Sequence, residues 1–311
     1  MENNMENRIE NKVEIKTNNS GIRITNLDLG NMNIKYSGQA GSSVFSSKIS
    51  TDSKPYEEGF QRIDIEGRKT YIGVGELSRE FSKAERDYVP QLLYGICKAN
   101  SDAEIIETNL SLLLPSLQMP NKHKLVETLK NKDFSFKFNG KDRVVSIKDL
   151  LILPEGYVSY FDLPEDERKQ DIAIIEVGSR TINICSVIQG KIEEMHTVKY
   201  GSLDFFTKIK NIEAGKGEDY VEEDIERLIK RGTIKVTKKA YEEFLNDILN
   251  YVKAYINIKN YNTWFTGGTS LMLKPYIEEK CKECKLFANP LTSNLNGSIV
   301  ASKKVWSNIN G

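Results

Sequence analysis

The fold is decided by residues 171–188, which read DIAIIEVGSRTINICSVI. Two apolar runs, 172–177 and 182–188, are rich in β-branched residues and are separated by a short turn that begins with Gly178. Apolar runs of this length, broken by glycine, favour a buried β-hairpin over a helix. Glu176 stands at the entrance of the turn, so the backbone N–H groups suit a phosphate and the carboxylate suits a metal ion. Polar glycine turns are common in hairpins, and one such turn does not by itself identify a phosphate site.

A second stretch, residues 24–36, repeats this plan. It reads ITNLDLGNMNIKY: an apolar strand, an acid, one residue, a glycine, a polar turn and another apolar strand. The motif Asp28-x-Gly30 aligns with Glu176-x-Gly178. Two hairpins of the phosphate-binding kind in one chain predict a duplicated architecture that closes on one ligand from both sides.

The length and composition permit two domains and argue against several classes of function. The chain has 311 residues, enough for two domains with full hydrophobic cores. Lys and Arg number 44 and Asp and Glu number 44, so there is no basic excess that would favour direct contact with nucleic acid. No run of 18 apolar residues predicts a membrane span, and residues 1–20 lack the apolar core of a secretory signal. We expect those 20 residues to be a disordered extension and the protein to be cytoplasmic.

Four cysteines are too few for a disulfide framework. Cys281 and Cys284 form an isolated C-x-x-C pair, and the chain has only two histidines, so a four-ligand zinc site is not expected. A helix end at the surface is the preferred interpretation of this pair.

Apolar periodicity and turn residues predict the other elements. The strands are expected at residues 63–65, 71–72, 105–114, 134–138, 143–147, 150–153, 192–198 and 263–265. The helices are expected at residues 88–98, 122–131, 221–230 and 238–258, and from near residues 203 and 271. An Asn296-Gly297 turn is expected before a closing helix, and the polar stretch 163–170 is the expected crossing between domains.

Three motifs in order carry a resemblance to a known superfamily. DLGNMNIK (28–35), EVGSRT (176–181) and TGGT (266–269) resemble the phosphate 1, phosphate 2 and adenosine signatures of the actin, Hsp70 and sugar-kinase superfamily. Within it the chain is most similar to the bacterial plasmid-segregation actins of the ParM type, over residues 22–309. The resemblance implies an α/β fold of two actin-like (ribonuclease H-like) domains with a nucleotide cleft between them. Domain I is expected at 21–170 with a C-terminal return at about 291–311, and domain II at 171–290.

The resemblance also implies a site for ATP or GTP with Mg²⁺. Asp28 and Glu176 would hold the metal, Asp28 through water because the ion keeps its hydration shell. Asp28, Glu155 and Glu176 are the expected catalytic carboxylates, and Glu155 would orient the attacking water. The residues expected at the nucleotide are Gly30, Asn31, Met32, Asn33, Lys35, Gly178, Ser179, Arg180, Thr181, Gly201, Glu223, Arg227, Gly267, Gly268 and Thr269.

Each group of these residues has a distinct expected role. The turn at 30–33 would donate N–H groups to the β-phosphate with Lys35 beside it, and the turn at 178–181 would close over the γ-phosphate. Residues 267–268 would let the backbone approach the adenosine and the α-phosphate. Gly201 opens a helix whose N-terminus is suited to an anion or to the ribose.

Two residues depart from the pattern of the superfamily. Glu176 stands where an aspartate is usual, and its extra methylene moves the carboxylate by ~1.5 Å. Because misplacement of about 1 Å can cost ~100-fold in rate, slow hydrolysis or altered nucleotide specificity is expected. Arg180 is bulkier than the usual turn residue, and it either contacts the γ-phosphate or points to solvent.

Ordinary roles compete with these assignments. Asp28 and Lys35 could be a strand-end acid and a solvated lysine, and Glu155 or Glu176 could have a purely structural role. Glu223 and Arg227 could form an exposed salt bridge one helical turn apart.

The resemblance implies a nucleoside triphosphatase that assembles into filaments and separates plasmid copies. A DNA-binding adaptor would bridge the filament to a centromere-like plasmid site, so the chain itself needs no contact with DNA or membrane. A monomeric small-molecule kinase of the same superfamily and a non-hydrolysing scaffold actin are the alternatives.

Overall fold

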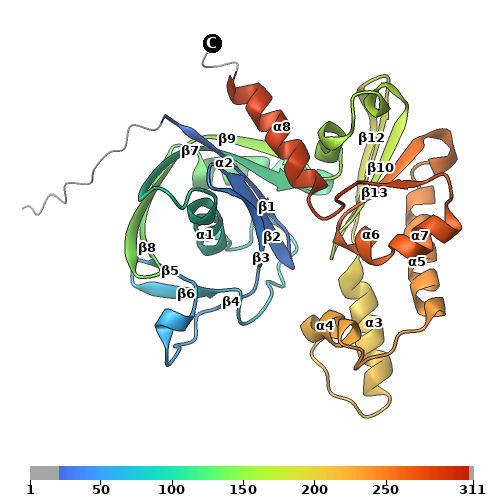
Figure 1. Cartoon of the computed structure of the whole chain (residues 1–311), viewed down its shortest axis with the longest axis horizontal. Coiled ribbons are helices and arrows are strands. Elements are labelled where there is room, and N and C mark those ends of the chain that lie inside the picture. The colour runs from blue at the N-terminus through green and yellow to red at the C-terminus, as the bar shows by residue number, and fades with distance from the viewer. Residues whose placement is uncertain (1–20, 308–311) are drawn as a thin grey trace, which may run out of the picture.

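The structure is a computed structural model that describes residues 21–307, so the expected disorder of residues 1–20 lies outside it. Two β-sheets lie next to each other, each covered by helices (Figure 1). The first sheet uses strands from residues 23–154 and the second uses strands from residues 172–286. None of the helices in residues 21–307 is long and apolar enough to cross a membrane.

The first sheet has nine strands in the order β3-β2-β1-β7-β9-β8-β5-β6-β4. Strands β1, β7 and β9 are parallel neighbours, and the other pairs are antiparallel. The strands are β1 (Arg23–Leu29), β2 (Asn33–Gly38), β3 (Gly41–Ser46), β4 (Ile49–Ser50), β5 (Arg62–Ile65), β6 (Arg68–Ile72), β7 (Ile105–Leu114), β8 (Lys132–Phe138) and β9 (Lys141–Pro154).

Helix α1 (Val89–Ala99) lies on the concave side of this sheet (Figure 1). It contacts β1 and β2 near one end of the strand order and β5 and β6 near the other. Its buried face includes Leu92, Leu93 and Ile96, which have no exposed surface and join the core of the sheet. A full turn of buried aliphatic side chains stabilises such a helix far more than its intrinsic propensity does. Helix α2 (Lys122–Leu129) contacts β9.

The second sheet has five strands in the order β12-β11-β10-β13-β14. Its strands are β10 (Ile172–Val177), β11 (Ile182–Ile188), β12 (Lys191–Val198), β13 (Asn262–Thr266) and β14 (Lys285–Leu286). Its helices are α3 (Ser202–Ala214), α4 (Ile225–Lys230), α5 (Lys238–Lys253), α6 (Gly268–Met272) and α7 (Lys274–Lys280). Strand β10 is buried along its whole length, as its almost wholly apolar sequence predicts, and Glu176 is its only charged residue.

The two sheets share one internal plan. In the first sheet β1 pairs antiparallel with β2 and parallel with β7. In the second sheet β10 pairs antiparallel with β11 and parallel with β13. Both hairpins expected from the sequence are therefore confirmed. In each, the first strand also has a parallel neighbour on its other side.

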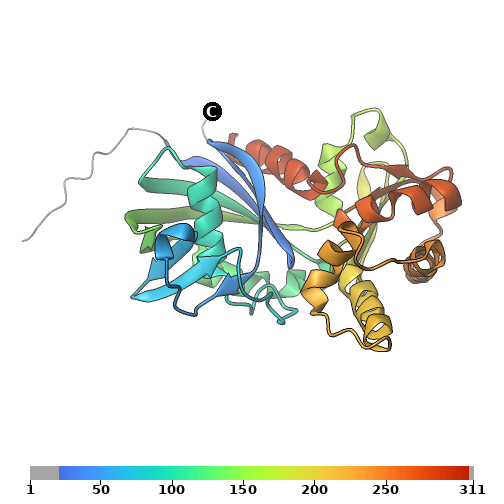
Figure 2. The same ribbon diagram turned by 60° about the horizontal axis from the view of Figure 1, so that its bottom comes forward.

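The chain returns to the first sheet through α8 (Ser293–Ser307), which contacts β1, β2 and β7. In both views α8 lies along the first sheet at the junction between the two halves (Figures 1 and 2). The prediction of a turn at Asn296-Gly297 is wrong, because both residues lie inside this helix. A Cβ at Gly297 would stand 1.8 Å from the carbonyl oxygen of Val158, so this glycine permits close packing of the helix.

Several other predicted boundaries need correction. The strands expected at 143–147 and 150–153 are one strand, β9, with a bulge at Lys148, which has no opposing residue in the register with β7. The helix expected at 221–230 is a 3₁₀ turn (Glu222–Asp224) followed by the short α4. Helix α5 ends at Lys253 instead of residue 258, and a 3₁₀ turn (Ile258–Asn260) leads into β13.

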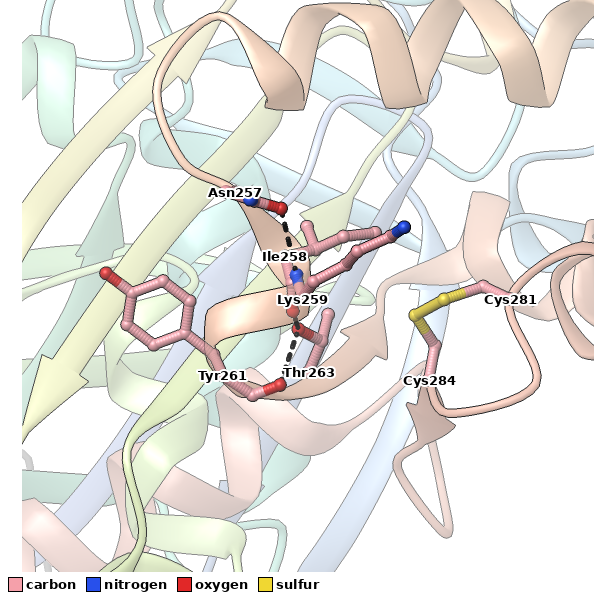
Figure 3. The surroundings of a disulfide bond; sticks show 7 residues. All are labelled: Asn257, Ile258, Lys259, Tyr261, Thr263, Cys281 and Cys284. Atoms are coloured by element: carbon pink, nitrogen blue, oxygen red, sulfur yellow. Dashed lines mark hydrogen bonds between the residues drawn. A yellow bond between two sulfur atoms is a disulfide. The ribbon is translucent and has the colours of Figure 1, made fainter.

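The C-x-x-C pair is a disulfide, which the sequence did not predict. Cys281 and Cys284 are bonded, with their Cα atoms 5.3 Å apart, directly after α7 ends. Figure 3 shows this disulfide and the neighbouring turn at residues 257–263. The interpretation as a helix end is confirmed. Cys97 and Cys185 are buried and free.

Candidate active site between the two sheets

The turns of the two hairpins face one cavity of about 420 Å³ that lies between the sheets. This volume is in the range of pockets that bind small molecules and cofactors. The expected site residues that line it are Asp28, Gly30, Asn31, Met32, Asn33, Lys35, Glu155, Glu176, Gly178, Ser179, Arg180, Thr181, Gly268 and Thr269. Residues far apart in the sequence thus converge on a single site.

Each hairpin places an acid opposite a polar partner on the next strand. Asp28 lies opposite Lys35, and the carboxylate oxygen Oδ2 accepts a hydrogen bond from Nζ at 2.7 Å. Glu176 lies opposite Asn183, whose Nδ2 donates to its Oε2 at 2.6 Å. Because both partners come seven residues after their acid, Asn183 is the counterpart of Lys35 in the second hairpin. Asn183 was not among the predicted site residues, although the repeat itself contains this signal.

Glu155 joins the two hairpins into one network. It follows β9 directly and is buried. Its Oε1 accepts a hydrogen bond from Lys83, whose Nζ also lies 3.6 Å from Oδ1 of Asp28. Its Oε2 accepts a hydrogen bond from Nδ2 of Asn183 at 3.2 Å. The network therefore runs from the first hairpin through Lys83 and Glu155 to the second hairpin.

The carboxyl groups of Asp28 and Glu176 differ in their electrostatic environment. Burial opposes the ionisation of Asp28, but Lys35 and Lys83 outweigh it and lower the pKa of this carboxyl. The pKa of Glu176 is raised to about 8, with burial as the largest cause and the carboxylates of Glu155 and Asp28 acting in the same direction. At neutral pH Glu176 therefore holds a proton in the protein alone, and a cation placed beside it would take the place of that proton.

Glycines keep both turns tight. A Cβ at Gly30 would lie 2.3 Å from the carbonyl oxygen of Asn33, so only glycine fits this turn. In the second turn the N–H of Gly178 donates to the carbonyl oxygen of Thr181 at 2.8 Å. The hydroxyl of Thr269 donates to the carbonyl oxygen of Gly178 at 2.7 Å, which attaches the third motif to the second turn. The backbone of both turns is thus fixed before any ligand binds.

Gly201 and Gly267 lie behind the second turn and do not line the cavity. A Cβ at Gly201 would lie 2.4 Å from the carbonyl carbon of Ser179, and one at Gly267 would lie 2.3 Å from the carbonyl oxygen of Val177. Both glycines therefore allow neighbouring backbone to approach the turn. In this structure they support the site from outside.

Glu223 and Arg227 are also absent from the cavity wall. Arg227 instead pairs with Asp224 at 3.2 Å near the surface. The face of α4 that lines the cavity carries Glu226 and Lys230, whose charged groups are 2.5 Å apart. Apolar side chains from the second half line the same part of the cavity: Phe206, Ile229, Tyr241, Leu271, Met272 and Leu291.

Arg180 lines the cavity and also forms hydrogen bonds to backbone of the first half of the molecule. Its guanidinium donates to the carbonyl oxygen of Ser78 at 2.8 Å and to that of Arg79 at 3.0 Å. These acceptors belong to residues 78–86, called the strap here, which precede α1 in the first half of the molecule. Arg180 therefore links the second hairpin to the strap.

Two cations of the strap line the cavity and were missed by the sequence analysis. They are Lys83, described above, and Arg86, which has 6% of its surface exposed. Arg86 donates through Nη2 to the carbonyl oxygen of Leu29 at 3.0 Å. Its Nε has no hydrogen-bond partner among the described residues. A buried, partly unsatisfied guanidinium at a cavity wall suits an anionic ligand.

Met32, at the tip of the first turn, reaches the other half of the molecule. It comes from the first hairpin and packs against the hydrophobic core of the second sheet. Met32 thus crosses the cleft from the first half to the second, and Arg180 crosses it from the second half to the first.

Comparison with solved structures identifies the fold. The apo crystal structure of the psk41 ParM protein matches with a TM-score of 0.70 at 16% identity, over 94% of this chain and 100% of that one. The archaeal actin homologue Ta0583 in complex with ADP matches with a TM-score of 0.73 at 14% identity, over 91% and 99% of the two chains. A subunit of a 15-stranded ParM filament from Clostridium botulinum matches with a TM-score of 0.76 at 17% identity, over 91% and 99%. No family model and no curated protein sequence matches the chain.

The duplicated hairpins, the two sheets and the cleft between them define a two-domain actin-like fold. More particularly, the ParM proteins have this fold, and their match extends over nearly the whole length of this chain.

Proposed function

We propose that this chain is an actin-like, filament-forming nucleoside triphosphatase of the ParM type that segregates plasmid copies. ATP or GTP would bind in the cleft with Mg²⁺. The observation that carries the proposal is the convergence of both glycine turns and three buried carboxyl groups on one cavity between the sheets. We also propose residues 21–170 with the return at 291–311 as domain I, and residues 171–290 as domain II.

The residues at the cavity fit a triphosphate. The tight turns at 30–33 and 178–181 border the cavity, and Lys35, Lys83 and Arg86 supply positive charge. The N–H groups of Gly30 and Gly178 bond within their own turns, so those of the following turn residues would serve the phosphates. Arg86 keeps one N–H without a partner among the described residues, which is a donor ready for an anion. The apolar wall beside α4 suits the flat faces of a nucleobase.

The same residues fit Mg²⁺ bound mostly through water. In the described part of the chain no three His, Cys, Asp or Glu side chains form a group that could hold a metal ion by themselves. Mg²⁺ commonly keeps several waters and uses one or two carboxylates together with phosphate oxygens. Asp28 and Glu176, on facing turns, would supply these carboxylates. The ion would neutralise charge on the transferred phosphoryl group.

Catalysis by this site would rest on positioning. Water would add to the terminal phosphorus as its bond to the bridging oxygen breaks, giving a nucleoside diphosphate, inorganic phosphate and a proton. Glu155, held by Lys83 and Asn183, would orient that water. The extra methylene of Glu176 supports a slow rate, because phosphoryl transfer depends strongly on geometry.

The proposed assembly follows from the similar structures. One of them is a ParM filament and another is an actin homologue with ADP bound. We propose that this chain likewise assembles with nucleotide and disassembles after hydrolysis. A DNA-binding adaptor at a centromere-like plasmid site would connect the filament to its cargo, in keeping with the zero net charge of the chain.

Light scattering and sedimentation at micromolar protein test the proposal, with ATP, GTP, the diphosphates and no nucleotide, each with and without Mg²⁺. We expect assembly with a triphosphate and Mg²⁺, followed by phosphate release. Asp28→Ala should abolish both signals, whereas Glu127→Gln, an exposed change on α2, should leave them unchanged. Absence of assembly with every nucleotide would refute the filament function. Phosphate transfer to a sugar or carboxylate acceptor would instead favour a small-molecule kinase. Assembly without phosphate release would favour a scaffold actin.

A further inference from the structure

The strap is attached to the first half of the molecule at several points. The carbonyl oxygen of Ser78 accepts a hydrogen bond from Nδ2 of Asn31 at 3.0 Å. Gln118 donates to the carbonyl oxygen of Phe81 at 3.1 Å and accepts from the backbone N–H of Lys83 at 2.8 Å. Together with Arg86, these bonds position the strap beside the first glycine turn.

Two side chains from the second half also hold the strap. Arg180 donates to the carbonyl oxygens of Ser78 and Arg79, as described above. The ammonium group of Lys199 lies 4.3 Å from the centre of the Phe81 ring, within cation–π distance. The strap therefore contacts both halves of the molecule.

The strap delivers one side chain to the centre of the carboxylate network. Lys83 has 12% of its side chain exposed and places Nζ between Asp28 and Glu155. Without this ammonium group, the three acids Asp28, Glu155 and Glu176 would share the site with Lys35. Glu155 would then lose one of its two hydrogen-bond partners and be left beside like charges.

We infer that Lys83 is a positioning residue for nucleotide hydrolysis, and that Arg180 makes its position depend on closure of the cleft. This inference rests on the proposed function. Lys83 holds the carboxylate of Glu155 in the orientation that directs the attacking water. Arg180 holds the strap from the second half, so separation of the two halves would remove one of the contacts that fix Lys83 and slow hydrolysis. The guanidinium of Arg180 suits this role because its planar fork reaches two carbonyl oxygens at once.

Lys83→Met tests the first part of the inference in the full chain. We expect kcat for phosphate release to fall about 100-fold, the scale of a misplaced catalytic group, while the Kd for nucleotide changes less than about threefold. Filaments should still assemble with triphosphate and should persist longer. Lys132→Met is the matched control, because it removes an exposed lysine from β8. Lys83→Arg should restore part of kcat, since it keeps the charge but not the geometry.

A purely structural role for Lys83 predicts a different pattern. Thermal stability would fall and kcat per folded molecule would stay at the wild-type value, which would overturn the inference. If Lys83→Met does not fold, Lys83→Arg decides: a wild-type kcat in that variant also overturns it. A wild-type protein that binds or hydrolyses no nucleotide refutes the proposed function and this inference together, whereas unchanged hydrolysis by Lys83→Met refutes the inference alone.

A double-mutant cycle tests the link to Arg180. We expect Arg180→Gln alone to lower kcat about 10-fold, and to have no further effect in a chain that already carries Lys83→Met. If Arg180 acted by touching the nucleotide, its removal would weaken nucleotide binding and the two losses in kcat would multiply. Multiplying losses would therefore refute the coupling through the strap.

Discussion

Replacing Glu176 by glutamine should stabilise the nucleotide-free protein, and the gain should grow with pH. Burial raises the pKa of this carboxyl from 4.5 to about 8 in the folded protein. Between these two values the folded state keeps the proton and the unfolded state has lost it. The wild-type protein therefore loses stability as pH rises through this window and reaches a plateau above about 8. Glutamine is neutral at every pH and keeps an oxygen that can accept the bond from Asn183.

The size of the effect follows from the same two values. A difference of 8 − 4.5 = 3.5 in pKa sets an upper limit of about 5 kcal/mol. Relaxation around the charged carboxylate lowers this figure, so a gain of about 1–3 kcal/mol at pH 8.5 is expected, with almost none at pH 5.

Thermal and urea unfolding at pH 5 and pH 8.5 in EDTA would measure this gain. Comparison of the variant with the wild-type protein at each pH cancels the titration of other groups. Glu127→Gln, on the surface of α2, serves as the control and should show no pH-dependent difference. An equal effect of Glu176→Gln at both pH values would show that the carboxyl is ionised in the folded state, and would refute the electrostatic account of the site.

Three further changes have outcomes that the structure predicts. Gly297→Ala forces a methyl group into a main-chain carbonyl and should cost more than about 3 kcal/mol of stability, read from denaturant unfolding; an unchanged midpoint would contradict the packing of α8. Gly30→Ala should abolish nucleotide binding in calorimetry, because the added atom distorts the first turn, whereas Gly59→Ala, with open space around it, should bind normally. Reduction of the bond between Cys281 and Cys284 should lower stability by at most about 2 kcal/mol, since the closed loop is short; thiol titration with and without reductant would show whether the bond is present.

Local sequence patterns predicted the sheets well. The strand expected at 105–114 has those limits in β7, because its last three residues are leucines and proline follows directly. The errors fall where distant contacts override a local signal. Asn296-Gly297 is a typical turn pair, but here the glycine lets α8 approach the backbone at Val158. The predicted end of α5 was too late. Apolar periodicity continues to the buried Ile256, but the helix stops at Lys253.

The candidate site was predictable in part. The acids of both turns follow from strand, glycine and repeat, and all line the cavity. Lys83 and Arg86 come from a polar segment without periodicity, and only tertiary contacts bring them to the cleft. Glu223 and Arg227 do not line the cavity, and Glu226 and Lys230 of the same segment line it instead.

Exposure of the Met32 side chain offers an independent measure of how far the two halves of the molecule separate. Its thioether is shielded in part by the hydrophobic core across the cleft, so any rotation that widens the gap must bring it into water. Peroxide converts exposed methionine to the sulfoxide faster than shielded methionine. The oxidation rate of this side chain, followed by mass spectrometry, would then report how often the two halves separate. The change in this rate on ligand binding would report how strongly the ligand holds the halves together.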